Sequence, residues 1–165
     1  MSKGFVREQD DTISPGALGE RPVSPFRNLV TPAGLTMIET EIAVLKDDLA
    51  NAEREGDSEK TALALRDLRY WMARRETAEV SVPDPETDVV RFGMWVTLTG
   101  DDGEERQWKI VGEDEADAAH HKISHVGALA KGLFGKGLGE SVEVNGKTWE
   151  IAGMDALDEQ GEHEN

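Results

Sequence analysis

The spacing of apolar residues changes once along this chain, and that change limits the available folds more than any other feature. From Leu35 to Ala52 apolar residues recur at alternating steps of three and four, which is the seven-residue repeat of packed helices. From Val89 onward the repeat becomes two, as in strands that bury one face. Because helical spacing comes first and strand spacing second, the chain predicts an α+β fold.

The helical half predicts two helices that fold back on each other. Thr31 is a suitable N-cap and Pro32 fits the first helical position. Gly56 falls where this helix would stop, and Asp57 or Ser58 can cap a second helix that reaches about residue 78. Two such helices with a short connection predict an antiparallel α-helical coiled-coil hairpin with its tip near 56–59. The expected seam of the second helix is Thr61, Leu65, Leu68 and Met72.

The second half predicts a small antiparallel β-sheet domain with one short helix. Asp102-Gly103 and Asn145-Gly146 are strong signals for tight turns between paired strands. The segment 128–134 fits one short helix, and Pro83 and Pro85 lie in the expected linker. The predicted parts are an extended or disordered arm (1–30), the hairpin (31–82), the sheet domain (83–154) and an acidic disordered tail (155–165).

Charge and composition exclude several classes of function. The net charge of −16 repels phosphate groups, so direct binding of nucleic acid is not expected. The sequence has no cysteine, which excludes disulfides and thiolate metal sites. No apolar run approaches the roughly 18 residues that cross a membrane. The absence of cysteine fits a cytoplasmic protein, and we expect a monomer.

Most candidate motifs for chemistry are weak. The glycines of "GKGLGE" fit neither common phosphate-binding pattern. His120, His121 and His125 could ligate a metal, but their spacing is more typical of a surface loop. The arginines of the second helix fit a solvated face, or a surface that meets an acidic partner or a phosphate. They are Arg66, Arg69, Arg74 and Arg75.

The turn between the two helices carries two carboxylates, Asp57 and Glu59. Taken alone, the turn fits a helix cap with acidic groups in the first helical turn. A rod that ends in carboxylates could also contribute to a Mg²⁺ site, because Mg²⁺ is held by one or two carboxylates together with substrate phosphates. Chemistry that uses two metal ions on phosphodiesters would be one such use.

Several segments together resemble one known family. "VRFGMWVTLTGDDGEERQWKIVGEDEAD" followed by "KISHVGALAKGLFGKGLGESVEV" is similar to the C-terminal domain of the GreA/GreB transcript cleavage and elongation factors, in its GreB form. "NLVTPAGL" resembles the start of the family's first helix, and "RDLRYWMARRETAEV" the end of its second. The opening "MSKGFVRE" is also GreB-like.

This resemblance implies a function and its residues. The sheet domain would have the FKBP-like fold and dock at the rim of the secondary channel of bacterial RNA polymerase. The hairpin would point down the channel, where Asp57 and Glu59 would help to hold a Mg²⁺ ion shared with the polymerase active site. The protein would be an accessory factor without a catalytic residue or cofactor of its own, and would meet the 3′ end of the nascent RNA only indirectly. The implied docking residues are Asp114, Glu115, Ser124, Gly127, Ala128 and Leu129.

Three differences from the family keep alternatives open. The tip reads "GDSEKTAL", with one residue fewer between its carboxylates than the family's "GDLSENAEY", and the hairpin is shorter. Gly127-Ala128 also replaces the family's Ser-Pro. One alternative is therefore a channel binder that does not stimulate RNA cleavage. Another is an acidic protein-interaction module unrelated to polymerase, and an isomerase is a third that the fold alone would not establish.

Overall fold

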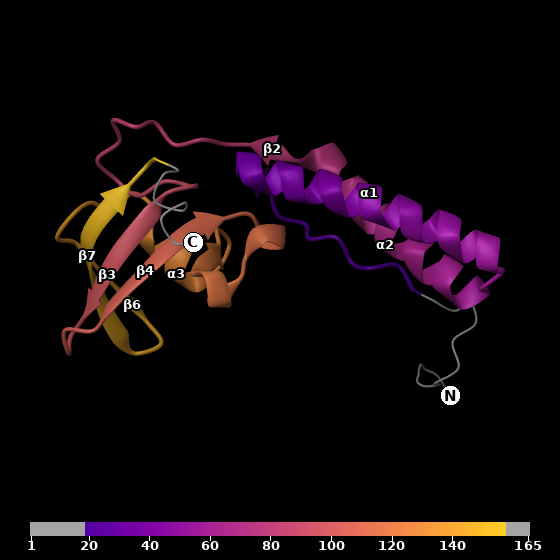
Figure 1. Ribbon diagram of the computed structural model, residues 1–165. Coiled ribbons are helices and arrows are strands. Elements are labelled where there is room, and N and C mark those ends of the chain that lie inside the picture. The colour runs from indigo at the N-terminus through magenta and orange to yellow at the C-terminus, as the bar shows by residue number, and fades with distance from the viewer. Residues whose placement is uncertain (1–18, 158–165) are drawn as a thin grey trace. The chain divides into compact units, whose positions relative to one another are not determined.

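The computed structural model describes residues 19–157 and is a mixed α+β structure (Figure 1). Its contacts divide the chain into two compact units. Among the described residues, the first holds 19–25 and Ile38–Thr77, and the second Phe26–Met37 and 78–157. The elements are β1 (Leu29–Val30), α1 (Pro32–Glu55), α2 (Ser58–Thr77), β2 (Glu79–Val80), β3 (Trp95–Gly100), β4 (Glu105–Val111), the 3₁₀ helices η2 (Glu113–Glu115) and η3 (Ala118–His120), β5 (Lys122–Ser124), α3 (Ala128–Leu133), β6 (Ser141–Val144) and β7 (Lys147–Asp155).

The two long helices lie side by side and run in opposite directions (Figure 1). α1 has 24 residues and α2 has 20, so at about 1.5 Å per residue they are roughly 36 and 30 Å long. The seam predicted for α1 is confirmed at Ile38, Ile42 and Ala52, which are almost fully buried. Burial of this apolar stripe, rather than intrinsic helix propensity, stabilises a helix of this kind.

The seam predicted for α2 is wrong at two positions. Leu65 and Met72 are 37% and 43% exposed, whereas Ala62 and Ala64 are buried together with Leu68. The prediction relied on the spacing of large apolar residues and gave alanine little weight. A helix can nevertheless bury a face that contains alanines, as α2 does at Ala62 and Ala64. The buried face of α2 is therefore narrower and rotated from the predicted one.

The second unit contains a five-stranded sheet in the order β5-β4-β3-β7-β6. All of its neighbouring strands are antiparallel except β4 and β5, which are parallel. Both predicted turns are confirmed: Gly103 has φ +83° between β3 and β4, and Asn145 and Gly146 have φ +56° and +76° between β6 and β7. Two successive positive φ angles are typical of the type I′ turn that matches the twist of paired strands.

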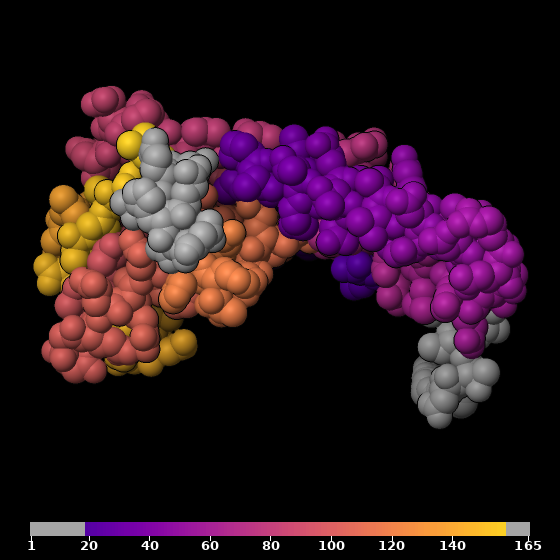
Figure 2. Space-filling model, viewed as in Figure 1, coloured from indigo at the N-terminus to yellow at the C-terminus, as the bar shows by residue number. Residues whose placement is uncertain are grey.

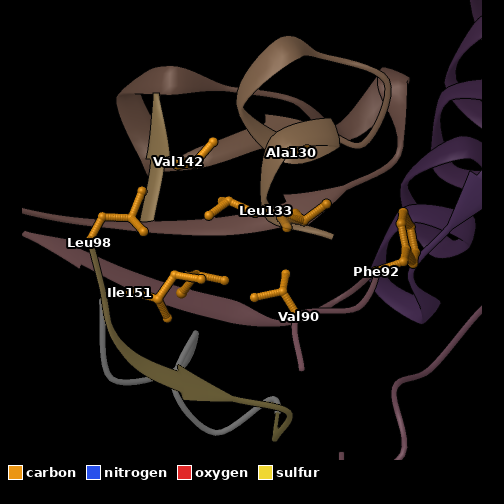
Figure 3. Close-up of a cluster of buried hydrophobic side chains, with 9 residues drawn as sticks. Val90, Phe92, Leu98, Ala130, Leu133, Val142 and Ile151 are labelled. Atoms are coloured by element: carbon orange, nitrogen blue, oxygen red, sulfur yellow. The ribbon is translucent and has the colours of Figure 1, made fainter. Parts of the chain in front are cut away.

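One hydrophobic core holds the sheet and α3 together (Figure 3). Leu133 and Ala130 of α3 are fully buried against Leu98 of β3 and Ile151 of β7. The short helix predicted near 128–134 is thus confirmed at Ala128–Leu133. Because α3 is buried in this core, it holds in place the loop between β5 and α3.

A second small sheet and a carboxylate hold the start of α1 within the second unit. β1 pairs in parallel with β2, so residues 29–30 are anchored rather than free. The Thr31 hydroxyl accepts a hydrogen bond from Gly34 N at 3.0 Å, which confirms Thr31 as the N-cap. The carboxylate of Glu115 accepts hydrogen bonds from Thr31 N (2.9 Å), Gly112 N (3.0 Å) and the Thr31 hydroxyl. A Cβ at Gly34 would lie 2.2 Å from Glu115 Cδ, so a larger residue there would displace the Glu115 carboxylate from these hydrogen bonds.

The two ends of the chain carried predictions as well. Residues 1–18 of the predicted arm and 158–165 of the predicted acidic tail lie outside the described residues. The four-part division of the chain stays a prediction. Within residues 19–157, no helix combines the length and apolar character that crossing a membrane requires.

Candidate functional site: the hairpin tip and an apolar groove

The tip of the hairpin is a two-residue connection whose backbone bonds are all local. Gly56 has φ +69°, a conformation that glycine adopts at little cost. Asp57 N donates to Ala52 O at 3.0 Å and Gly56 N to Glu53 O at 3.2 Å. These two bonds are the pattern that ends many helices at a glycine. Gly56 therefore stops α1, as the sequence predicted.

Asp57 is the N-cap of α2. Its Oδ1 accepts from Lys60 N at 3.1 Å, and its backbone oxygen accepts from the Thr61 hydroxyl at 2.9 Å. An aspartate in this position satisfies a backbone N–H that the helix leaves open, which is worth about 1 kcal/mol. The half-buried Asp57 carboxylate thus already has a structural task.

Glu59 is exposed in the first turn of α2, where its charge interacts favourably with the helix dipole. Positions two apart at a helix start do not face each other, so the backbone does not direct Asp57 and Glu59 to one point. Lys60 Nζ also lies 3.6 Å from Glu55 Oε1, which adds a cation to the tip. In the space-filling view, the atoms at the end of the hairpin are visible in magenta (Figure 2).

The donor atoms at the tip suit Mg²⁺ in kind but not in number. Carboxylate oxygens are the ligands that Mg²⁺ prefers, and one or two carboxylates suffice only when phosphates and water supply the rest. Among residues 19–157 no group of three or more His, Asp or Glu side chains could hold a metal ion. Asp57 and Glu59 can therefore contribute to a site that another molecule completes, but they do not form one alone.

The three neighbouring histidines have separate surroundings. His120 Nδ1 lies 2.7 Å from Asp117 Oδ2, and this hydrogen bond is the main cause that lowers the pKa of the Asp117 carboxyl. The ring centroid of His121 lies 6.0 Å from that of Trp108. The buried His125 ring meets the Phe92 ring edge-on at 5.4 Å. Their separate surroundings argue against one shared metal site, and only His120 and His121 lie on the surface as predicted.

A groove of about 700 Å³ lies on the sheet domain. Its apolar lining includes Trp108 on β4, Ile123 on β5, Leu129 on α3 and Trp149 on β7. Three cationic residues line it as well: Arg106, Lys122 and Lys147. Lys147 Nζ bonds Glu104 Oε1 at 2.7 Å and lies 4.7 Å from the Trp149 ring centroid, and the bond to Glu104 is the main cause that raises the pKa of Lys147. Arg106 also pairs with Glu104, and Asp117 adds a carboxylate to the lining, so positive charge is only in slight excess. Such a surface fits a partner that is mainly apolar and weakly acidic.

The structure divides the six predicted docking residues into two groups. Ser124, Gly127, Ala128 and Leu129 all line the groove. Asp114 and Glu115 belong to η2 and do not line it. Glu115 instead binds the start of α1 through its two hydrogen bonds from Thr31, and accepts a third from Gly112 N. Nothing in this geometry tests whether any of the six contacts a partner.

Sequence reasoning missed the two tryptophans and the three cationic residues of the groove. They come from β4, β5 and β7, which are separated by up to 43 positions between Arg106 and Trp149. Trp108 is half-buried, whereas Ile110, which an alternating strand places on the same face, is fully buried. The signal that could have found the groove is the position of both tryptophans on strands that enclose the predicted short helix.

Comparisons with known proteins agree with one another on the family. The sequence model of a family described as "Transcription elongation factor, GreA/GreB, C-term" matches residues 84–152. The chain is 37% identical over 123 residues to transcription elongation factor GreA of Azorhizobium caulinodans, covering 72% of this chain and 77% of that protein. It is 43% identical over 93 residues to GreA of Rhodopseudomonas palustris strain TIE-1, covering 53% of this chain and 58% of that relative's length.

A similar solved structure is the prokaryotic transcription elongation factor GreA/GreB from Nitrosomonas europaea. The identity is 18% and the TM-score 0.40, with 78% of this chain and 98% of that chain covered.

Proposed function

Because the chain belongs to the GreA/GreB family of transcription elongation factors, we propose that it binds RNA polymerase and modulates elongation from the secondary channel. It would act there as a cytoplasmic monomer and an accessory factor, not as an enzyme with its own catalytic residues. In this proposal α1 and α2 form a coiled coil and the sheet domain is FKBP-like. The names of the GreA relatives support the general function.

The observation that carries the proposal is the groove on the sheet domain. Four residues that the family resemblance implies for docking, Ser124 and 127–129, come together along its lining. Two tryptophans supply the large aromatic surfaces that dominate binding energy at many protein interfaces. We therefore place polymerase docking in this groove, with a partially acidic and partially apolar element of the polymerase as its occupant.

At the tip we propose occupancy of the channel without an essential role in RNA cleavage. Asp57 Oδ1 is engaged by the Lys60 backbone, and Glu59 does not face Asp57. A hairpin with arms of 24 and 20 residues extends roughly 30–36 Å, which limits how far its tip penetrates. Such a factor would compete with other proteins for the channel and would meet the RNA 3′ end only through the polymerase.

Stimulation of RNA cleavage is the second candidate, favoured by the exposed carboxylate of Glu59 at the tip. In that case Asp57 and Glu59 would be partial ligands of a Mg²⁺ ion held mainly by the polymerase. The ion would supply a polarised water for hydrolysis of the RNA backbone. The residues of this chain would position that site and exclude bulk water.

One experiment separates these alternatives. Stalled, backtracked elongation complexes are incubated with the wild-type protein or with Asp57→Asn/Glu59→Gln, and bound protein and RNA length are both measured. We expect binding by both proteins and no shortened RNA from either. Shortened RNA with the wild type alone would establish cleavage stimulation instead. If neither protein binds polymerase, the proposed function is wrong, and the acidic interaction module becomes the better hypothesis.

A further inference from the structure

The segment Gly19–Pro25 lies along α2 within the first compact unit (indigo in Figure 1). It has no regular secondary structure. Pro22 and Pro25 disfavour helical conformation in the residues before them and keep the backbone extended. We call residues 19–25 the strap.

Two consecutive strap residues of opposite charge pair with two charges of α2. Glu20 accepts hydrogen bonds from Arg69 Nε at 2.9 Å and from Arg69 Nη2 at 2.7 Å, so the guanidinium grips the carboxylate with two donors. Arg21 Nη1 lies 3.3 Å from Asp67 Oδ1. Each of the two pairs joins opposite charges, so both favour a strap that lies against α2.

Aromatic contact adds to these ion pairs. The Arg21 guanidinium lies 4.0 Å from the Tyr70 ring centroid and 5.8 Å from that of Trp71. Such cation–π geometry is favourable at protein surfaces. The strap therefore contacts four side chains of α2: Asp67, Arg69, Tyr70 and Trp71.

The contacts are exposed and thus reversible. The side chains of Glu20 and Arg69 are 63% and 52% exposed, and Val23 of the strap is 45% exposed. Exposed ion pairs are weak and are screened by salt. The bond from Arg69 lowers the pKa of Glu20, so the pair remains ionic at neutral pH. Contacts of this kind favour the closed strap by about tenfold.

We propose that the strap is an intramolecular competitor that blocks the Arg69–Tyr70 face of α2. Glu20 occupies Arg69 as the carboxylate of a protein partner would, so a partner with an acidic group must displace the strap to contact this face. The inference rests on the proposed function, in which the hairpin enters a polymerase channel. Opening the strap would raise the affinity for polymerase by up to about tenfold, the factor by which closure reduces the competent population.

The first test measures the strap in the isolated full-length protein. Because the sequence has no cysteine, Val23→Cys on the strap and Leu63→Cys on α2 allow two spin labels to be attached at exposed positions. We expect a short, narrow distance distribution at low salt and a broad one at 1 M salt. Glu20→Arg and Arg69→Glu should each broaden it, and the double exchange should restore it. Glu39→Arg, the same charge change at an exposed position of α1, is the control and should leave the distribution unchanged.

An unchanged distribution in Glu20→Arg, or a double exchange that does not restore closure, would overturn the proposal. The second test measures polymerase affinity for Glu20→Gln beside Glu39→Gln, and tighter binding is expected only for Glu20→Gln. Equal affinity of Glu20→Gln and wild type would refute the strap as a competitor while leaving the proposed function intact. Failure of every protein to bind, the wild type included, would refute the proposed function itself.

Discussion

The hairpin tip and the sheet groove are both candidate sites, yet they are built from different kinds of contact. At the tip every hydrogen bond joins residues that lie within five positions of each other, such as Asp57 and Lys60. The groove draws its lining from β4, β5, α3 and β7, which meet only when the whole sheet forms. The tip therefore depends on local helix capping, whereas the groove depends on the core beneath it.

This difference has a consequence for mutation. Changes at the tip should alter local helix stability by small amounts and leave the rest of the molecule intact. Changes beneath the groove should affect both folding and binding, and only changes on its surface should affect binding alone.

The largest effect is expected from Leu133→Ala in α3. Leu133 is fully buried in the core that supports the groove, and removing a leucine side chain from such a site costs about 2–5 kcal/mol of unfolding free energy. Denaturant unfolding measures the loss. Leu138→Ala, at a position 63% exposed, is the control and should change stability by no more than about 0.5 kcal/mol. Equal effects would mean that α3 does not anchor the groove.

The next effect is on binding alone. Ala128→Glu places a carboxylate at an exposed residue of the groove lining, so folding should be preserved. An acidic polymerase element would then be repelled, and we expect at least a tenfold loss of affinity, or about 1.4 kcal/mol. A titration of labelled protein with polymerase measures it, with Leu138→Glu outside the groove as the matched control. Unchanged binding by Ala128→Glu would place docking elsewhere.

At the tip, a pair of substitutions separates the cap from any metal role. Asp57→Ala should cost about 1 kcal/mol of stability because the Lys60 backbone N–H loses its acceptor. Asp57→Asn should cost almost nothing, because asparagine caps helices as well as aspartate does. Thermal unfolding of the two variants, with Glu59→Gln as control, gives the comparison. A large loss in Asp57→Asn would show that the charge itself matters to folding.

The same contrast explains what the sequence could and could not predict. Gly56, Asp57 and the Asn145-Gly146 turn were predicted correctly, because each is determined by residues a few positions away. Glu115 was assigned to docking by resemblance alone, and only the structure places its carboxylate on Thr31, 84 positions earlier. The exposure of Leu65 and Met72 was likewise missed, because it depends on which face of α2 is buried in the folded unit. Local chemistry can be predicted from sequence, whereas convergence of distant residues cannot.

The smallest expected effect concerns Asp117, a carboxylate of the groove that also caps a helix. Its Oδ1 accepts from Ala119 N at 3.1 Å, as Asp57 Oδ1 does from Lys60 N at the tip. The hydrogen bond from His120 is the main cause that lowers the Asp117 pKa. Because the folded-state pKa is lowered, this contact contributes stability above the ordinary carboxyl pKa and loses it as the pH falls through the lowered pKa.

A carboxyl NMR titration of wild type and His120→Ala tests this directly. The pKa of Asp117 should be higher in His120→Ala, while the backbone cap from Ala119 keeps some of the lowering in place. Asp102 is the internal control, because its pKa is lowered mainly by the hydrogen bond from Glu104 N and not by His120, so its lowering should persist in the variant. An Asp117 pKa that does not move would assign the lowering to the helix cap. The Asp117 carboxylate would then depend only on local capping, as Asp57 does at the tip. The groove and the tip would in that respect be built alike.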